Sequence, residues 1–388
     1  MQTLEDRGSP RRRVWPVVLG VVAVVAVAAG VGYAVGHHGS ILGSDSPAAR
    51  PTTTTSTVPP LSVVSTTPAN GSTGVAPDVT IEVHFSRPIA RVTAVPTLSP
   101  AVAGSWSQPD RTSLVFTASA PFIPSSTESV TLPAGLGGGG RRAQPGLAVA
   151  DTVEFTVESG STERLQQLLA EAGYLPLSFT PTGGTPPANE VADVQPGSFA
   201  WRWPMPATLT SLWSEGLPNV ITQAAVMQFE EQNGLTVDGV AGPMVWTTLL
   251  KDAAAGATDP NSYNYVVVSK VLPENLTLYV NGNPQFTGIP VNTGAPGADT
   301  TDGTYPVFEH VQSSEMKGTN PDGTTYDDKN VPWASYFNGG DALHGFVRAS
   351  YGSPQSNGCV EMSIADAQTL WPLTPVGTLV TITGPAVT

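Results

Sequence analysis

The amino-acid sequence predicts a multidomain protein that is mainly β-structure. A chain of 388 residues is too long for a single hydrophobic core, so two to four domains are expected. Charged residues make up only 12% of the chain, whereas glycine and proline number 40 and 37, a balance that favours strands and turns over long charged helices. Short alternating apolar runs recur in residues 62–158 and again from residue 263, with a helical segment between them.

The N-terminal residues combine a basic cluster with a long apolar stretch. Three consecutive arginines at 11–13 precede residues 14–36, which contain no charged side chain. About 20 apolar residues in a helix span a bilayer, and basic residues favour its cytoplasmic side. We therefore expect a cytoplasmic tail at 1–13, a single-pass anchor in the cell membrane at 14–36 and an extracytoplasmic bulk. A cleaved signal peptide is the alternative, although its apolar core is usually shorter.

A spacer and a β domain are expected after the anchor. Residues 37–61 are rich in proline, threonine and serine, which is typical of an extended linker. Residues 62–158 carry short alternating runs separated by turn residues at about ten-residue spacing, which predicts a β-sandwich of about 100 residues. The stretch "PANGSTGVAPDVTIEVHFSRPI" resembles the opening of bacterial Ig-like domains, which implies an Ig-like β-sandwich.

Residues 161–252 contain two helical segments. The first, "STERLQQLLAEAGYL", opens with a polar cap and places Leu165, Leu168 and Leu169 on one face. The second contains "FEEQNGLTVDGVAGPMVWTTLL", which resembles the small helical peptidoglycan-binding domain. An insertion at about 176–216 separates the two segments and is far longer than the usual link. Cell-wall binding by this domain is therefore implied by analogy alone.

The chain has a single cysteine, Cys359, which follows His344. In an exported chain it cannot form an intramolecular disulfide. A thiolate is a strong nucleophile, a nearby histidine can accept its proton, and the preceding Gly358 lets the backbone approach a substrate closely. A lone cysteine is, however, often buried and inert. The residues alone leave both interpretations open.

Four motifs occur in a fixed order from residue 263 onward. They are "VNTG" at 291–294, "TTDGTYPV" at 300–307, "ALHG" at 342–345 and "SNGCVEM" at 356–362. Together they resemble the signature of the L,D-transpeptidase catalytic domain, also called YkuD, over residues 263–384. The resemblance implies a β-rich catalytic domain at the C-terminal end of a cell-wall protein.

The resemblance also implies roles for individual residues. Cys359 would be the acylated nucleophile and His344 its base, with the His344 ring held by the carbonyl of Gly345. Ser356 and Asn357 would support the loop, and the N–H groups of Gly358 and Cys359 would form the oxyanion hole. Cys359 would attack the third residue of a peptidoglycan donor stem tetrapeptide and release D-Ala. The amine of an acceptor stem would then complete a 3→3 cross-link, whereas water would give an L,D-carboxypeptidase. No metal or cofactor is implied.

Two positions depart from the family pattern. Many members have histidine where this chain has Asn357, and the arginine usual two positions after the cysteine is Glu361 here. If that arginine meets a substrate carboxylate, recognition is altered, and Arg348 is the nearest basic candidate to replace it. Residues 309–335 are interpreted as a loop beside the site. Its apolar residues that could cover a bound stem are Met316, Tyr326 and Trp333.

Other functional classes fit less well. The net charge of −14 argues against a nucleic-acid partner. A sortase needs an arginine after its cysteine, and residues 360–388 contain no arginine or lysine. Papain-like wall hydrolases place cysteine before histidine, the reverse of the order found here. A non-catalytic wall-binding scaffold is the remaining alternative. Carbapenems acylate the resembled family, so formation of a carbapenem adduct would distinguish the enzyme from the scaffold.

Overall fold

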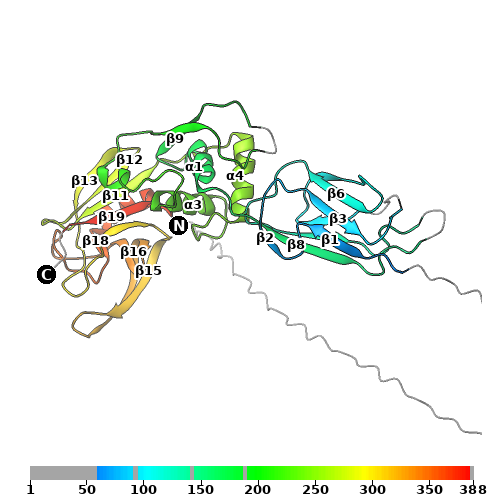
Figure 1. Ribbon diagram of the computed structural model, residues 1–388. Helices are drawn as coiled ribbons and strands as arrows, with labels where there is room; N and C mark the ends of the chain where they lie inside the picture. Colours follow the sequence, from blue (N-terminus) through cyan, green and yellow to red (C-terminus); the bar gives the residue numbers. More distant parts are fainter. Residues whose placement is uncertain (1–58, 91–94, 140–143, 187–189, 385–388) are drawn as a thin grey trace, which may run out of the picture. The chain divides into compact units, whose positions relative to one another are not determined.

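The computed structural model describes residues 59–90, 95–139, 144–186 and 190–384 (Figure 1). Strands make up 38% of the structure and helices 16%, which confirms the predicted multidomain, mainly β fold. The predicted tail at 1–13, the anchor at 14–36 and most of the linker lie outside the described residues. Within the described ranges, no helix is both long enough and apolar enough to cross a membrane.

The first described domain is a β-sandwich of two four-stranded sheets. Their strand orders are β1-β3-β6-β5 and β2-β8-β7-β4. Apolar side chains that alternate along the strands, such as Val83, Phe116 and Phe155, are buried between the sheets. The strands are β1 (Val63–Thr67), β2 (Ser72–Val75), β3 (Ile81–Phe85), β4 (Thr97–Ser99), β5 (Gly104–Ser107), β6 (Ser113–Ala118), β7 (Thr127–Leu132) and β8 (Asp151–Val157).

The helical region begins at α1 (Thr162–Glu171), where Ser161 caps the first turn by accepting a hydrogen bond from Arg164 N at 3.4 Å. The two following long helices, α3 (Val220–Gln232) and α4 (Pro243–Ala255), pack with α1 around Phe229 and Trp246. The insertion forms a hairpin and one short helix. These elements are β9 (Leu177–Pro181), β10 (Gly197–Trp201) and α2 (Ala207–Thr210).

The catalytic candidate region contains a five-stranded and a four-stranded sheet, with orders β13-β12-β11-β19-β14 and β15-β16-β17-β18. Val266, Leu278, Val360 and Ile382 belong to one buried cluster that both sheets share. The elements are β11 (Asn264–Ser269), β12 (Asn275–Val280), β13 (Asn283–Pro290), β14 (Gly303–Pro306), β15 (Glu309–Thr319), β16 (Thr325–Asn338), β17 (Asp341–Gly345), β18 (Val360–Met362), α5 (Ile364–Leu370), the 3-10 helix η1 (Trp371–Leu373) and β19 (Leu379–Thr383).

The segment interpreted as a loop from residue 309 is instead a long hairpin formed by β15 and β16. Charged side chains occur along both strands, and Lys329 forms ion pairs with Glu315 and Asp327. Because polar residues occupy most positions of these strands, the alternating apolar pattern that marks a half-buried strand is missing from the sequence. The prediction of a loop was therefore wrong, and paired backbone hydrogen bonds hold this segment.

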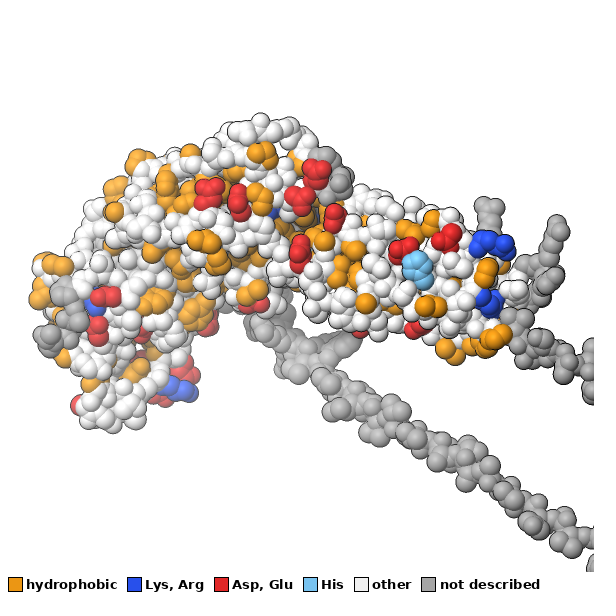
Figure 2. All heavy atoms as spheres, in the orientation of Figure 1, with side chains coloured by type: hydrophobic (Ala, Val, Ile, Leu, Met, Phe, Trp, Pro, Cys, Tyr) orange, Lys and Arg blue, Asp and Glu red, His pale blue; other side chains and the backbone are white. Residues whose placement is uncertain are grey.

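Charged side chains are sparse over the described surface. On the face shown in Figure 2 they lie singly or in small groups among polar and apolar side chains, and acidic ones predominate. This distribution follows from the composition, in which 31 Asp and Glu outnumber 17 Lys and Arg. On the face shown, the described residues form no broad basic patch for a polyanion.

Candidate active site

The four sequence motifs lie side by side in the structure. Asn292 and Glu361 exchange two backbone hydrogen bonds, each 2.9 Å long, which join the first motif to the fourth. Thr300 of the second motif donates from Oγ1 to the carbonyl of Gly358 at 2.7 Å. The third and fourth motifs are neighbouring parallel strands, in which His344 pairs with Glu361. Residues far apart in the sequence are thereby brought to one site.

A pocket of about 270 Å³ contains both predicted catalytic side chains, Cys359 and His344. It lies between the β15–β16 hairpin and strands β17 and β18. Its other lining residues are Glu315, Met316, Lys317, Tyr326, Asp328, Tyr336, Gly340, Asp341, Phe346, Arg348, Asn357 and Glu361. The predicted substrate-contact residues Met316, Tyr326 and Arg348 are therefore at the pocket.

Trp333, also predicted to contact the substrate, is not among the lining residues. Its ring packs against Trp371, with 5.5 Å between the ring centroids. Asn357 lines the pocket and donates from Nδ2 to Asn320 Oδ1 at 2.6 Å, which ties the cysteine-bearing loop to the tip of the β15–β16 hairpin.

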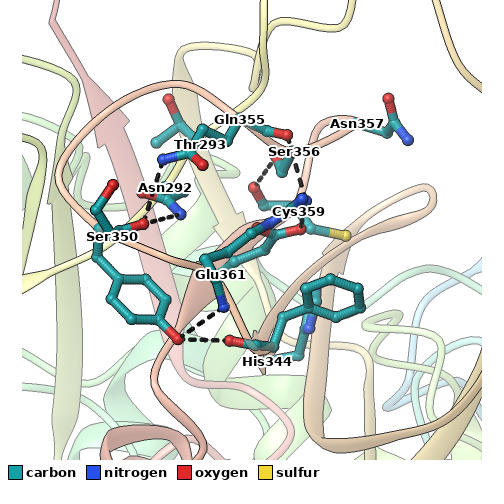
Figure 3. Close-up of polar contacts among 12 residues, drawn as sticks. Asn292, Thr293, His344, Ser350, Gln355, Ser356, Asn357, Cys359 and Glu361 are labelled. Atoms are coloured by element: carbon teal, nitrogen blue, oxygen red, sulfur yellow. Dashed lines mark hydrogen bonds and ion pairs between the residues drawn. The ribbon is translucent and has the colours of Figure 1, made fainter.

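The turn that carries Cys359 is held by Ser356. The Ser356 hydroxyl donates to the carbonyl of Cys359 at 2.5 Å and accepts from Gly358 N at 3.2 Å (Figure 3). Gly358 has φ of +113°, a conformation that only glycine adopts without strain. A Cβ atom at that position would also collide with a carboxylate oxygen of Asp341. The motif therefore needs serine and glycine for structural reasons.

The occupied N–H of Gly358 bears on the predicted oxyanion hole. In the structure this N–H donates to Ser356 Oγ at 3.2 Å. A substrate oxygen would have to share the N–H with Ser356 Oγ or displace it, and an N–H group can be shared between two acceptors. The role that the resemblance implied for Gly358 therefore stays a prediction.

His344 is fixed on strand β17 with only 3% of its surface exposed. Its Nδ1 lies 3.2 Å from the carbonyl oxygen of Gly345, the contact that the family resemblance implied. Because a carbonyl only accepts hydrogen bonds, Nδ1 carries the proton and Nε2 keeps a lone pair. The edge of the ring meets Phe346 at 90°, with centroids 5.9 Å apart. The imidazole is thus held with Nε2 able to accept a proton.

Burial dominates the electrostatics of both groups. It raises the pKa of the Cys359 thiol to about 12, an effect that a backbone hydrogen bond from Ala342 opposes and the negative charges of Asp341 and Glu361 reinforce. Burial also lowers the pKa of His344, against the effect of the Gly345 carbonyl. At neutral pH the resting site therefore contains a neutral thiol and a neutral imidazole. A thiol in such a site would have to lose its proton during attack, because no ion pair with the imidazole is formed beforehand.

Glu361, the departure from the family pattern, is paired with Arg348. The guanidinium donates from Nε to Glu361 Oε2 and from Nη2 to Oε1, both at 2.7 Å. Nη2 also reaches the carbonyl of Gln355 at 3.3 Å, and the guanidinium lies 4.8 Å from the ring centroid of Phe346. This bidentate geometry is the strong form of a carboxylate–arginine pair. The negative charge of Glu361 is therefore balanced within the pocket wall.

Arg348→Ala is expected to destabilise the protein by about 2–3 kcal/mol, because it leaves a carboxylate that is almost fully buried without its partner. The measurement is urea unfolding of the wild type, Arg348→Ala, Glu361→Gln and the double variant. The double variant should cost clearly less than the sum of the single ones, since both charges are then gone. Strictly additive effects would contradict the pairing.

Several pocket residues were missed by sequence reasoning. Asp341 and Gly340 lie at the turn between β16 and β17, and no motif or spacing marks them. The partner of Glu361, in contrast, could have been identified from the sequence. Arg348 is the sole lysine or arginine after residue 329, so it was the one basic side chain available to a glutamate in that part of the sequence.

Comparison with known proteins agrees with the three folded regions. Residues 263–382 match the L,D-transpeptidase catalytic domain (YkuD), residues 56–157 match a bacterial Ig-like domain and residues 218–249 match a peptidoglycan binding domain. A comparison with curated proteins finds no match.

Solved structures of L,D-transpeptidases are similar to the chain at low identity. One from Mycobacterium smegmatis is 14% identical, with 84% of this chain and 100% of that chain covered and a TM-score of 0.28. L,D-transpeptidase 3 from Mycobacterium tuberculosis is also 14% identical, with 83% and 98% covered and a TM-score of 0.29. The catalytic domain from the E. faecium L,D-transpeptidase is 23% identical, with 31% and 96% covered and a TM-score of 0.28.

These TM-scores are too low to add to the assignment, which depends on the matched domains. The chain contains an L,D-transpeptidase catalytic domain at residues 263–382, preceded by a bacterial Ig-like domain and a peptidoglycan binding domain.

Proposed function

We propose that this protein is a peptidoglycan L,D-transpeptidase that forms 3→3 cross-links through a thioester on Cys359. The observation that carries the proposal is the meeting of Cys359 and His344 in one pocket within the matched catalytic domain. The peptidoglycan binding domain earlier in the chain supports the same substrate class. The reaction is acyl transfer in two steps.

In the first step a donor stem tetrapeptide acylates the enzyme. His344 Nε2 accepts the thiol proton while Cys359 Sγ attacks the carbonyl carbon of the third stem residue. The tetrahedral intermediate then collapses, the C–N bond to D-Ala breaks, and the protonated His344 gives its proton to the departing amine. The neutral resting state of both groups supports this order of events.

In the second step an amine of the acceptor stem attacks the thioester carbonyl. A new C–N bond forms, the C–Sγ bond breaks, and His344 carries a proton from the amine to the departing thiolate. Nothing in this sequence of bonds requires Glu361 to be an arginine. Because Arg348 already balances Glu361, the pocket wall retains a guanidinium that can meet a donor carboxylate through its remaining N–H groups.

The proposal is tested by the products formed from a disaccharide-tetrapeptide. The full-length chain is incubated with this substrate, and the mixture is resolved by liquid chromatography and mass spectrometry. A cross-linked dimer that has lost one D-Ala is the expected result. Tripeptide and D-Ala without dimer would identify an L,D-carboxypeptidase instead. Unchanged substrate in the presence of folded protein would contradict both activities and favour a wall-binding scaffold.

We also propose that residues 14–36 anchor the protein in the cell membrane and that the remainder lies in the cell-wall space. The uncharged apolar stretch behind three arginines supports this topology. In fractionated cells, the chain should remain in the membrane pellet after an alkaline carbonate wash. Protease added to intact cells from which the wall has been removed should degrade the part of the chain that follows the anchor. Recovery of an N-terminally shortened, soluble chain would show a cleaved signal peptide instead.

A further inference from the structure

Asp341 lies beside the nucleophile, and no family motif includes it. We propose that its carboxylate binds the ammonium group of the acceptor stem and places that nitrogen against the thioester on Cys359. This inference rests on the proposed transpeptidase function and adds a residue for its second step.

The position of Asp341 follows from the turn between β16 and β17. The thiol of Cys359 donates to the carbonyl of Gly340 at 3.6 Å, and Asp341 is the next residue. On the other side, a carboxylate oxygen of Asp341 fills the space that a Cβ at position 358 would need. The carboxylate therefore adjoins the Gly358–Cys359 backbone and lines the same pocket as the thiol.

No lysine or arginine among the described residues forms an ion pair with Asp341. Two other carboxylates of the pocket differ in this respect, because Glu361 is paired with Arg348 and Glu315 with Lys317 and Lys329. Burial raises the pKa of Asp341 to about 6, although a hydrogen bond with the Asn338 side chain opposes this effect. An ionised, partly buried carboxylate without a cation is unfavourable, and a bound cation would relieve it.

The first step of the reaction gains nothing from Asp341. Its negative charge contributes to the raised pKa of the Cys359 thiol, which disfavours the nucleophilic form. The second step brings a cation to the same place, because the acceptor amine of a stem peptide is protonated at neutral pH. A carboxylate beside the sulfur is therefore suited to binding the acceptor ammonium in the second step. It does not help the thiol to attack the donor in the first step.

The acceptor ammonium gives one proton to the Asp341 carboxylate, and the freed nitrogen lone pair attacks the thioester carbonyl carbon. As the C–N bond forms and the C–Sγ bond breaks, a second proton passes from the nitrogen through His344 to Sγ. The products are the amide, a neutral thiol, a neutral imidazole and protonated Asp341, which releases its proton to solvent.

The test compares the two half-reactions in full-length wild type and Asp341→Asn. Acylation is measured as the rate of carbapenem adduct formation, and resolution as the ratio of cross-linked dimer to tripeptide from disaccharide-tetrapeptide. Asp341→Asn should acylate as fast as the wild type or faster, whereas the ratio of dimer to tripeptide should fall by about tenfold or more. Asp327→Asn, which removes an exposed carboxylate outside the pocket, is the matched control and should leave both measurements unchanged.

Hydroxylamine separates a charge effect from a general defect. It is an uncharged nucleophile above neutral pH, so its attack on the acyl-enzyme should proceed equally fast in wild type and Asp341→Asn. Equal losses in acylation, hydroxylamine attack and cross-linking would show a structural role and overturn the inference. An unchanged dimer ratio in an active variant would overturn it as well. A wild-type chain that forms no acyl-enzyme would overturn the proposed function together with this inference.

Discussion

Cys359→Ala is expected to abolish both carbapenem acylation and product formation, with a loss of at least about 10⁴-fold in rate. The reason is that alanine offers no atom that can form the covalent intermediate, and this is the chain's single cysteine. The rate of D-Ala release from disaccharide-tetrapeptide is the measurement. Because the Cys359 sulfur makes only weak hydrogen bonds, to the Gly340 carbonyl and with the backbone of Ala342, the substitution should leave the fold intact.

Thermal unfolding of Cys359→Ala provides the control for that result, and its midpoint should lie within a few degrees of the wild type. Retained D-Ala release by this variant would show that another group performs the chemistry. If Cys359→Ala were inactive because it is unfolded, the rate of D-Ala release would be measured with Cys359→Ser. This variant keeps the shape of the side chain and replaces the thiol by a weaker nucleophile.

His344→Gln is expected to slow acylation by about 10²–10⁴-fold, because the thiol is neutral in the resting site and has to lose its proton during attack. Glutamine preserves the polar bulk of this buried position but is not a base. The rate of carbapenem adduct formation measures the loss. His84→Gln, which changes a partly exposed histidine on β3, far from the pocket in sequence and absent from its lining, is the matched control and should acylate at the wild-type rate.

The pH profile of acylation gives a separate test of His344 as a base. Burial lowers the pKa of its imidazole below the ordinary value of about 6.5, so the neutral form persists to lower pH. Acylation should therefore be independent of pH from about 6.5 upward into the weakly alkaline range and should fall as the solution becomes more acidic. A rate of iodoacetamide alkylation that stays high and constant at acidic pH would contradict the neutral pair, because it would indicate a thiolate–imidazolium pair.

The strong sequence signals correspond to parts of the site fixed by local chemistry. The glycine at 358 is demanded by its φ angle, Ser356 by the two hydrogen bonds of the turn, and Gly345 by close packing, since a Cβ there would lie 3.1 Å from Ile364 Cα. Each requirement limits one position to one or two residue types, so it appears in the sequence as a motif. This is why Cys359, His344 and the loop between them stand out in the sequence.

Other parts of the site depend on contacts between distant residues and have no local signature. The β15–β16 hairpin is held by backbone pairing and by ion pairs between polar side chains, so its sequence resembles a loop. Asp341 matters because a turn places it against residue 358, and no spacing in the chain reveals this contact. The Arg348–Glu361 pair lies between these cases. The unexpected negative charge of Glu361 indicated that a basic partner was needed, but the sequence did not give the geometry of the pair.

The central claim, a thioester on Cys359, is tested most directly by trapping the acyl-enzyme. The full-length chain is mixed with disaccharide-tetrapeptide, quenched in acid within one turnover and measured by intact and peptide mass spectrometry. We expect a single adduct with the mass of the disaccharide-tripeptide acyl group, located on the peptide that contains Cys359 and removed by hydroxylamine. An adduct on any other side chain, or cross-linked product formed with Cys359 never modified, would contradict the account.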